Sequence, residues 1–174
     1  MQLDVLEQLD ALEQAIDEVV SSDPESCADL ESVERLQRQA SRLEAYATRA
    51  TGAMEVEGQW ATSGARTAAA WQAWACHQSS PVAKRSVRRS RHLRQLRVLE
   101  EAWSEGSLTG AHVDAIIAVR NPRTEAALER DEELLVAQAK KLSFETFVRA
   151  LAYWVQLADP EGTEESAEER RSRR

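Results

Sequence analysis

The chain has 174 residues, of which 43% are apolar and 30% are charged. This length is typical of one domain with its own core, and the composition is too apolar for a disordered chain. Charged residues interrupt every apolar segment before it reaches the ~20 residues of a membrane-spanning helix. The start, MQLDVLEQLDALEQ, has acids where a signal peptide has a basic segment. The sequence therefore predicts a globular, soluble and cytoplasmic protein that has no contact with a membrane.

The N-terminal part predicts two long helices, because apolar residues recur there at steps of three and four. The first helix covers residues 3–20, and its apolar stripe consists of Val5, Leu9, Leu12, Ile16 and Val19. The second helix has a heptad seam formed by Leu36, Ala40, Leu43, Ala47, Ala50 and Met54. We expect a long antiparallel helical hairpin over residues 3–57. The alanines favour close packing of this seam against a neighbour within the domain, and a homodimer through the hairpin stays open.

The middle of the chain predicts a short helix over residues 66–76 and a longer one that starts at Ser80-Pro81 and extends to about Ser104. The five tryptophans divide into two groups. Those expected in the core are Trp71, Trp74, Trp103 and Trp154. Trp60, in a turn flanked by glycines, is expected to be partly exposed.

The C-terminal part predicts three helices followed by a charged tail. Thr109 caps the first, Asn121-Pro122 opens the second, and Ser143 caps the third, which ends near residue 157. Residues 159–174 lack large apolar side chains and are expected to form a solvated tail or linker. The fold class is therefore all-α with about seven helices. We expect one domain over residues 1–158, made of parts 3–57, 64–104 and 109–157.

Residues that could carry catalysis or bind a metal are few. His77, His92 and His112 are scattered, and Cys27 and Cys76 stand alone without a metal-ligand spacing. No serine lies in a nucleophile elbow. We expect reduced cysteines, no metal, no cofactor, no small-molecule substrate and no catalytic residue, so the chain by itself is not predicted to be an enzyme.

The net charge of −8 conceals a strong partition. Residues 58–99 contain eight basic and no acidic residues, whereas the other 132 residues contain 14 basic and 30 acidic ones. The sequence thus predicts an acidic protein with one basic element.

The basic element is concentrated on the helix that starts at Pro81. At about 100° per residue, one arc of this helix contains Lys84, Arg85, Arg88, Arg91, His92 and Gln95. Val82, Ala83, Ser86, Val87, Ser90 and Leu93 lie on the opposite arc. Arg94 and Arg97 fall near the apolar arc, so either the helix bends there or these two side chains extend towards acids such as Glu100 and Glu101.

A cationic stripe of this kind attracts the phosphate backbone of nucleic acid. We therefore expect binding of double-stranded DNA through five residues, Lys84, Arg85, Arg88, Arg89 and Arg91. Contact with about five phosphates predicts a slope of log affinity against log salt of about −4.5. The competing interpretations are a solvated surface helix, or arginines that pair with the acidic part of the same chain.

The segment TAAAWQAWACHQSSPVAKRSVRRS has the outline of a helix-turn-helix. In that motif the second helix enters the major groove with its N-terminal residues towards the bases. Pro81, Val82, Lys84 and Arg85 would then face the groove, and Arg88, Arg89 and Arg91 would contact the backbone. Cys76-His77 stands where a glycine often makes the turn.

Two further hypotheses stay open. The chain could be a protein-interaction or dimerisation module whose basic helix docks on an acidic partner. Alternatively, the tail acids Glu161, Glu164, Glu165, Glu168 and Glu169 could cover the basic helix and suppress binding of DNA.

Four segments carry a resemblance to a known family: SGARTAAAWQAW, SSPVAKRSVRRSRHL, EGSLTGAHVDAI and LVAQAKKLSFETFVRALAYWVQLADPEG. From about Leu30 onward the chain resembles the actinobacterial domain-of-unknown-function family 222. This family is the helical N-terminal part of proteins that commonly carry a C-terminal HNH endonuclease domain. We expect the chain to serve as the targeting part of such a protein, and this expectation rests on the basic helix because the helical part of the family has no assigned site. No residue of this sequence matches the zinc-binding cysteines or catalytic histidines of the nuclease, so cleavage is not carried over. The chain is expected to be either a truncated piece or a natural form without the HNH domain.

Overall fold

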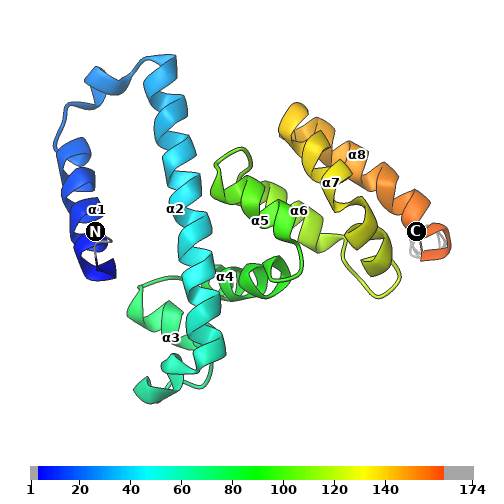
Figure 1. The fold of residues 1–174 in the computed structure, drawn as a ribbon, viewed down its shortest axis with the longest axis horizontal. Coiled ribbons are helices and arrows are strands. Elements are labelled where there is room, and N and C mark those ends of the chain that lie inside the picture. Colours follow the sequence, from blue (N-terminus) through cyan, green and yellow to red (C-terminus); the bar gives the residue numbers. More distant parts are fainter. Residues whose placement is uncertain (1–3, 163–174) are drawn as a thin grey trace, which may run out of the picture. The chain divides into compact units, whose positions relative to one another are not determined.

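The protein is all-α, as the sequence predicts. The computed structural model describes residues 4–162, and within them it has eight α-helices, two short 3-10 helices and no strand (Figure 1). The α-helices are α1 (Val5–Val20), α2 (Leu30–Glu57), α3 (Ala68–Ala75), α4 (Ser80–Leu93), α5 (Arg97–Ser104), α6 (Gly110–Ala118), α7 (Glu125–Lys141) and α8 (Phe144–Ala158). The 3-10 helices are η1 (Pro24–Cys27) and η2 (Gln59–Ser63). The hypothesis that acids of the tail cover the basic helix concerns residues 161–169, most of which lie outside the described residues.

The helix count exceeds the expected seven because the predicted helix over residues 80–104 is broken into α4 and α5. The chain bends at Arg94–Leu96, and Leu93, Leu96 and Leu99 are all essentially inaccessible to solvent. No side chain at the N-cap of α5 accepts a hydrogen bond. Instead, Oε1 of Glu132 on α7 accepts one from the backbone N–H of Leu99 at 2.9 Å. The bend thus places three leucines in the core, and a carboxylate from another helix accepts a hydrogen bond from a backbone N–H in the first turn of α5.

The chain divides into two compact units, residues 1–38 and 39–174, and the division falls within α2. In the first unit, α1 begins with a capping box in which Asp4 and Glu7 each accept a backbone hydrogen bond. No residue of α1 is buried. Val5, Leu9, Ile16 and Val19, which belong to the predicted apolar stripe, are all exposed. The single domain over residues 1–158 and its three parts stay a prediction.

In the second unit the core is formed by helices α4 to α8, together with Ala45 of α2. Its largest buried side chains are Trp103 and Phe147, and α7 and α8 lie side by side (Figure 1). Thr67 and Ser143 cap α3 and α8 through their side chains, and Thr109 caps α6 in a capping box with His112. The core therefore presents α4 with one face buried and the other open to solvent.

The face of α2 that packs in this unit is not the predicted heptad seam. The buried residues of α2 are Ala45, Thr48 and Gly52, whereas Leu43 of the seam is exposed. Gly52 lies so close to α4 that an added Cβ would stand 2.9 Å from Cβ of Ser90. Small side chains on this face allow the two backbones to approach, which explains why the apolar pattern alone indicated the wrong face.

The expectations for the tryptophans are confirmed in part. Trp103 and Trp154 are buried, and Trp60 and Trp71 are half-buried. Trp74, expected in the core, is 77% exposed, so this prediction was wrong. Within the described residues, no helix is long and apolar enough to cross a membrane.

Candidate nucleic-acid interface

The basic helix α4 follows α3 across a short turn, and the two helices pack against each other. His77 in this turn adopts a left-handed conformation with φ of 51°, which is the conformation that a glycine usually supplies. Pro81 lies in the first turn of α4, where its missing N–H costs no helical hydrogen bond. On the inner side, Ala83, Val87 and Leu93 are buried, as the apolar arc predicts.

Three of the five predicted site residues point outward. Lys84, Arg85 and Arg88 are exposed, and we call them the outer cations of α4. Arg85 lies 3.7 Å from the carboxylate of Asp114 and keeps 55% of its side chain exposed. Arg88 donates a long hydrogen bond of 3.5 Å to the carbonyl oxygen of Ile117. Together with Pro81, Asp114 and Ala118, the outer cations line an open surface pocket.

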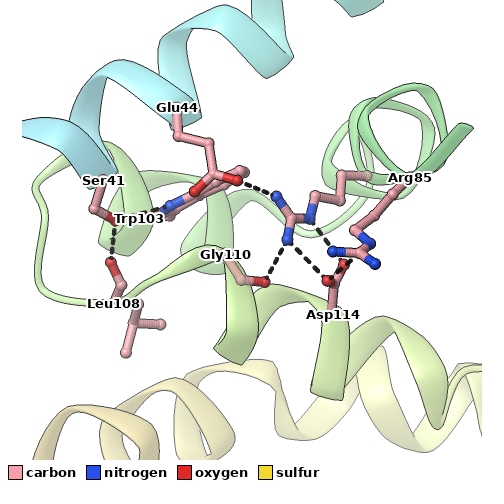
Figure 2. Close-up of polar contacts among 8 residues, drawn as sticks. Ser41, Glu44, Arg85, Trp103, Leu108, Gly110 and Asp114 are labelled. Atoms are coloured by element: carbon pink, nitrogen blue, oxygen red, sulfur yellow. Dashed lines mark hydrogen bonds and ion pairs between the residues drawn. The ribbon is translucent and has the colours of Figure 1, made fainter. Parts of the chain in front are cut away.

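The fourth predicted residue, Arg89, is turned into the protein. Its Nε and Nη2 donate to the two carboxylate oxygens of Asp114 at 2.8 Å each, and Nη2 also donates to the carbonyl oxygen of Gly110 at 3.1 Å. Its Nη1 lies 2.5 Å from Oε1 of Glu44. Figure 2 shows Glu44, Gly110 and Asp114 gathered around this guanidinium. Cζ of Arg89 lies over the ring of Trp103, 5.3 Å from the ring centroid.

The environment of Arg89 explains why it stays charged although only 8% of its side chain is exposed. Burial by itself would lower the pKa of Arg89, but the carboxylates of Asp114 and Glu44 more than offset this and raise it. Each of its three nitrogens donates at least one hydrogen bond within the chain. Arg89 therefore holds α2, α4 and α6 together, and it is not accessible to phosphate in the way the sequence predicted.

The fifth predicted residue, Arg91, is exposed but paired. Its Nε and Nη2 lie 2.9 Å and 2.5 Å from Oε1 of Glu55 on α2, and Arg94 reaches Oε2 of the same carboxylate at 3.1 Å. The pKa of Glu55 is lowered, chiefly by the hydrogen bond from Arg91. Arg94 thus extends towards Glu55 rather than towards the neighbouring acids that the sequence suggested.

The sequence missed the acids that pair with α4, namely Glu44 and Glu55 of α2 and Asp114 of α6. They are distant from α4 in the chain, so no local spacing could have identified them. It also missed Arg120, whose side chain is 7% exposed and pairs with Glu125. Arg120 contacts Nδ1 of His92, and burial and the nearby Arg120 and Arg88 lower the pKa of His92.

The structure also describes the cysteines and the residue types that bind metals. Cys27 and Cys76 are free cysteines. Among residues 4–162, no three His, Cys, Asp or Glu side chains are grouped so that they could hold a metal ion.

Comparison with known families gives a match to the model described as "Domain of unknown function (DUF222)", over residues 30–174. Because the match covers most of the chain, the protein belongs to this family, as its resemblance implied. Neither curated proteins nor solved structures gave a match.

Proposed function

We propose that this member of the DUF222 family is a DNA-binding helical domain, non-catalytic by itself, that serves as the targeting part of an HNH-endonuclease-type protein. The supporting observation is that Lys84, Arg85 and Arg88 lie exposed on a helix that contains no acidic residue. A duplex presents a dense row of negative charges, and arginine adds two-pronged hydrogen bonding to phosphate or to guanine. The association with an HNH domain rests on the family resemblance alone.

The corner formed by α3, the turn at His77 and α4 supports docking in the manner of a helix-turn-helix. In such motifs the second helix enters the major groove with its N-terminal half. In α4 this half has exposed Pro81, Val82, Lys84 and Arg85. Lys84 and Arg85 would then lie nearest the bases, and Arg88 would contact the phosphate backbone.

The structure narrows the set of residues proposed to contact DNA. Arg89 is engaged with Asp114 and Glu44, and Arg91 is engaged with Glu55. The outer cations therefore carry the proposed contact. If each neutralises one phosphate, the slope of log affinity against log salt is about −2.7 instead of about −4.5.

Fluorescence anisotropy of a labelled duplex, titrated with the full chain at several salt concentrations, tests this function. The variant Lys84→Gln/Arg88→Gln should lose most of the affinity and flatten the salt slope by about 1.8. The matched control is Lys140→Gln/Lys141→Gln, which removes the same charge from the end of α7. Absence of binding by the wild-type chain at low salt, or equal losses in the two variants, would refute the proposal.

A second candidate function is protein interaction, in the form of a homodimer through the N-terminal helices. The observation that favours it is the exposure of Leu9, Ile16 and Val19 on α1 and of Leu36 at the start of α2, all within the first unit. Apolar residues at heptad spacing are covered when a second helix with the same spacing packs on them. Two such helical hairpins would form a four-helix bundle.

Sedimentation of the chain over a range of concentrations tests the homodimer. Wild-type chains should associate, and Ile16→Glu should shift the equilibrium to the monomer. Ala11→Glu adds the same charge to another exposed side of α1 and serves as the control. A wild-type chain that stays monomeric at all concentrations contradicts this candidate, whereas association without any binding of duplex favours it over the DNA-binding function.

A further inference from the structure

The last turn of α4 and the segment after it hold two arginines that converge on one carboxylate. Arg91 donates to Glu55 from Nε, at 2.9 Å to Oε1 and 3.2 Å to Oε2, and from Nη2, at 2.5 Å to Oε1. Nη2 of Arg94 donates to Oε2 of the same carboxylate at 3.1 Å. The arginine side chains are 64% and 49% exposed, whereas the Glu55 side chain is only 14% exposed. The carboxylate is thus enclosed by the two cations, and the cations themselves face solvent.

We infer that Arg91 and Arg94 form a second phosphate-binding site, and that Glu55 occupies this site as an internal anion and thereby closes it to the DNA backbone. The inference rests on the proposed DNA-binding function and extends the same surface. It assigns a role to Arg91 and Arg94 that differs from the role of the outer cations. The outer cations are open to a ligand, whereas these two are available only when the charge of Glu55 is removed or displaced.

The geometry of the cluster fits a phosphate. Carboxylate and phosphate both place two oxygens where an arginine fork can donate two parallel hydrogen bonds. Arg91 already binds Glu55 in this two-pronged manner, with Nη2 donating to Oε1 at 2.5 Å and Nε donating to Oε2 at 3.2 Å. Arg94 also donates to Oε2, at 3.1 Å. Both guanidinium groups are already oriented towards the position that a phosphate would take in place of the carboxylate. Binding of phosphate would therefore cost little side-chain conformational entropy.

Glu55 is held in place by its own backbone. Its carbonyl oxygen accepts a hydrogen bond from the N–H of Gly58 at 3.2 Å and another from Nε1 of Trp60 at 3.4 Å. Gly58 has φ of 70° and ends α2 in the left-handed conformation. These contacts fix the end of α2 beside α4. Because Arg91 keeps the pKa of Glu55 below its ordinary value, Glu55 stays ionised at neutral pH.

The closed site continues the face that carries the outer cations. Arg91 follows Lys84 by seven residues, which is two turns of helix and a rise of about 10.5 Å along the same side of α4. A DNA strand lying along the outer cations would therefore reach Arg91 next. In the free protein it would meet the negative charge of Glu55 at that point.

The experiment compares Glu55→Gln with Glu57→Gln in the full chain. Glu57 is exposed on the last turn of α2, and no ion pair involves it among residues 4–162. Both variants remove one negative charge from the same helix, but only Glu55→Gln frees the two arginines. Circular dichroism and the melting temperature establish that both variants are folded.

Two readouts are measured for each variant. The first is the rise in melting temperature caused by inorganic phosphate over chloride at equal ionic strength, which should be larger for Glu55→Gln. The second is anisotropy with a labelled duplex, in which Glu55→Gln should bind about tenfold more tightly than Glu57→Gln and steepen the salt slope by up to about 1.8. Adding Arg91→Gln to Glu55→Gln should abolish most of both gains.

The outcomes separate this inference from the proposed function. If wild type binds duplex and Glu55→Gln gains no more than Glu57→Gln in either readout, the masked site is refuted and the DNA-binding function stands. If no variant binds duplex but phosphate selectively stabilises Glu55→Gln, the anion site stands and the DNA-binding function fails. If Glu55→Gln does not fold, Glu55→Ala and Glu57→Ala are compared in the same two measurements, and equal responses refute the site.

Discussion

Arg89 of α4 and Asp114 of α6 form a two-pronged ion pair in which both nitrogen–oxygen distances are 2.8 Å. The guanidinium is nearly inaccessible to solvent and also binds Glu44 of α2. Three helices from separate parts of the sequence therefore meet at one cation. Helix α4 thus uses one arginine to anchor itself and leaves Lys84, Arg85 and Arg88 exposed on its outer face.

Replacing Arg89 by lysine should destabilise the fold. Lysine cannot donate two parallel hydrogen bonds to Asp114 and also reach Glu44 and the carbonyl of Gly110. Lysine keeps the positive charge, so the loss comes from acceptors left without a donor, at about 1–3 kcal/mol for a buried group, and we expect about 2 kcal/mol because Glu44 and Asp114 are partly exposed. Urea denaturation followed by circular dichroism measures this loss.

Arg85→Lys is the matched control for this prediction. Arg85 faces the same carboxylate at 3.7 Å, but its side chain is 55% exposed. Such a surface pair contributes about 0–1 kcal/mol, so the free energy of unfolding should change little. Equal effects of the two lysine substitutions would contradict the anchoring role of Arg89.

Gly52→Ala should separate α2 from α4. The added Cβ would lie 2.9 Å from Cβ and 3.2 Å from Oγ of Ser90, and neither helix can yield without moving its backbone. Overpacking of this kind costs about 1–3 kcal/mol in the free energy of unfolding. Adding Ser90→Gly removes the clashing atoms and should recover part of the loss in a double-mutant cycle. Additive losses would show that the close approach is not the cause.

Glu132→Gln should gain stability relative to wild type as the pH rises. Burial raises the pKa of Glu132 above its usual 4.5, although the backbone of α5 donates to its carboxylate. The stability that the protonated form contributes is present below the unfolded pKa and is lost as pH rises through the folded pKa. Glutamine mimics the protonated form at every pH. Denaturation of both proteins at about pH 4 and about pH 7 measures how the difference between their free energies of unfolding changes with pH. If this difference is the same at both pH values, the pKa of Glu132 is not raised in the folded protein.

Asp131→Asn should show the opposite pH dependence. Arg130 and Nε1 of Trp154 both donate to this carboxylate, and they lower its pKa to about 2. The stability from a lowered pKa is present above the unfolded value of 3.8 and is lost as pH falls towards 2. The advantage of wild type over Asp131→Asn should therefore shrink between about pH 5 and about pH 2. In Arg130→Gln, the titration of Asp131 followed by nuclear magnetic resonance should move up towards 3.8.

Local patterns predicted most helices and their starts. Thr109 and Ser143 cap helices as expected, and Pro81 occupies a first turn. The sequence did not decide whether the helix breaks at Arg94–Leu96. A bend, or a straight helix whose arginines extend towards acids, would each explain why Arg94 and Arg97 fall near the apolar arc. The face on which α2 packs was predicted wrongly, because Gly52 and Thr48 pack by being small, and smallness gives no apolar periodicity.

The amino-acid sequence by itself determined that the chain is all-α, that it belongs to the DUF222 family, and that its basic residues gather on one helix. These properties depend on residue periodicity and composition, which are local. Tertiary structure decided which of those basic residues are paired with acids. Arg89 and Arg91 have the same chemistry as Arg88, but acids 36 to 45 residues earlier in the chain neutralise them. An ion pair depends on distance in space, and only folding brings Glu44 and Glu55 to α4.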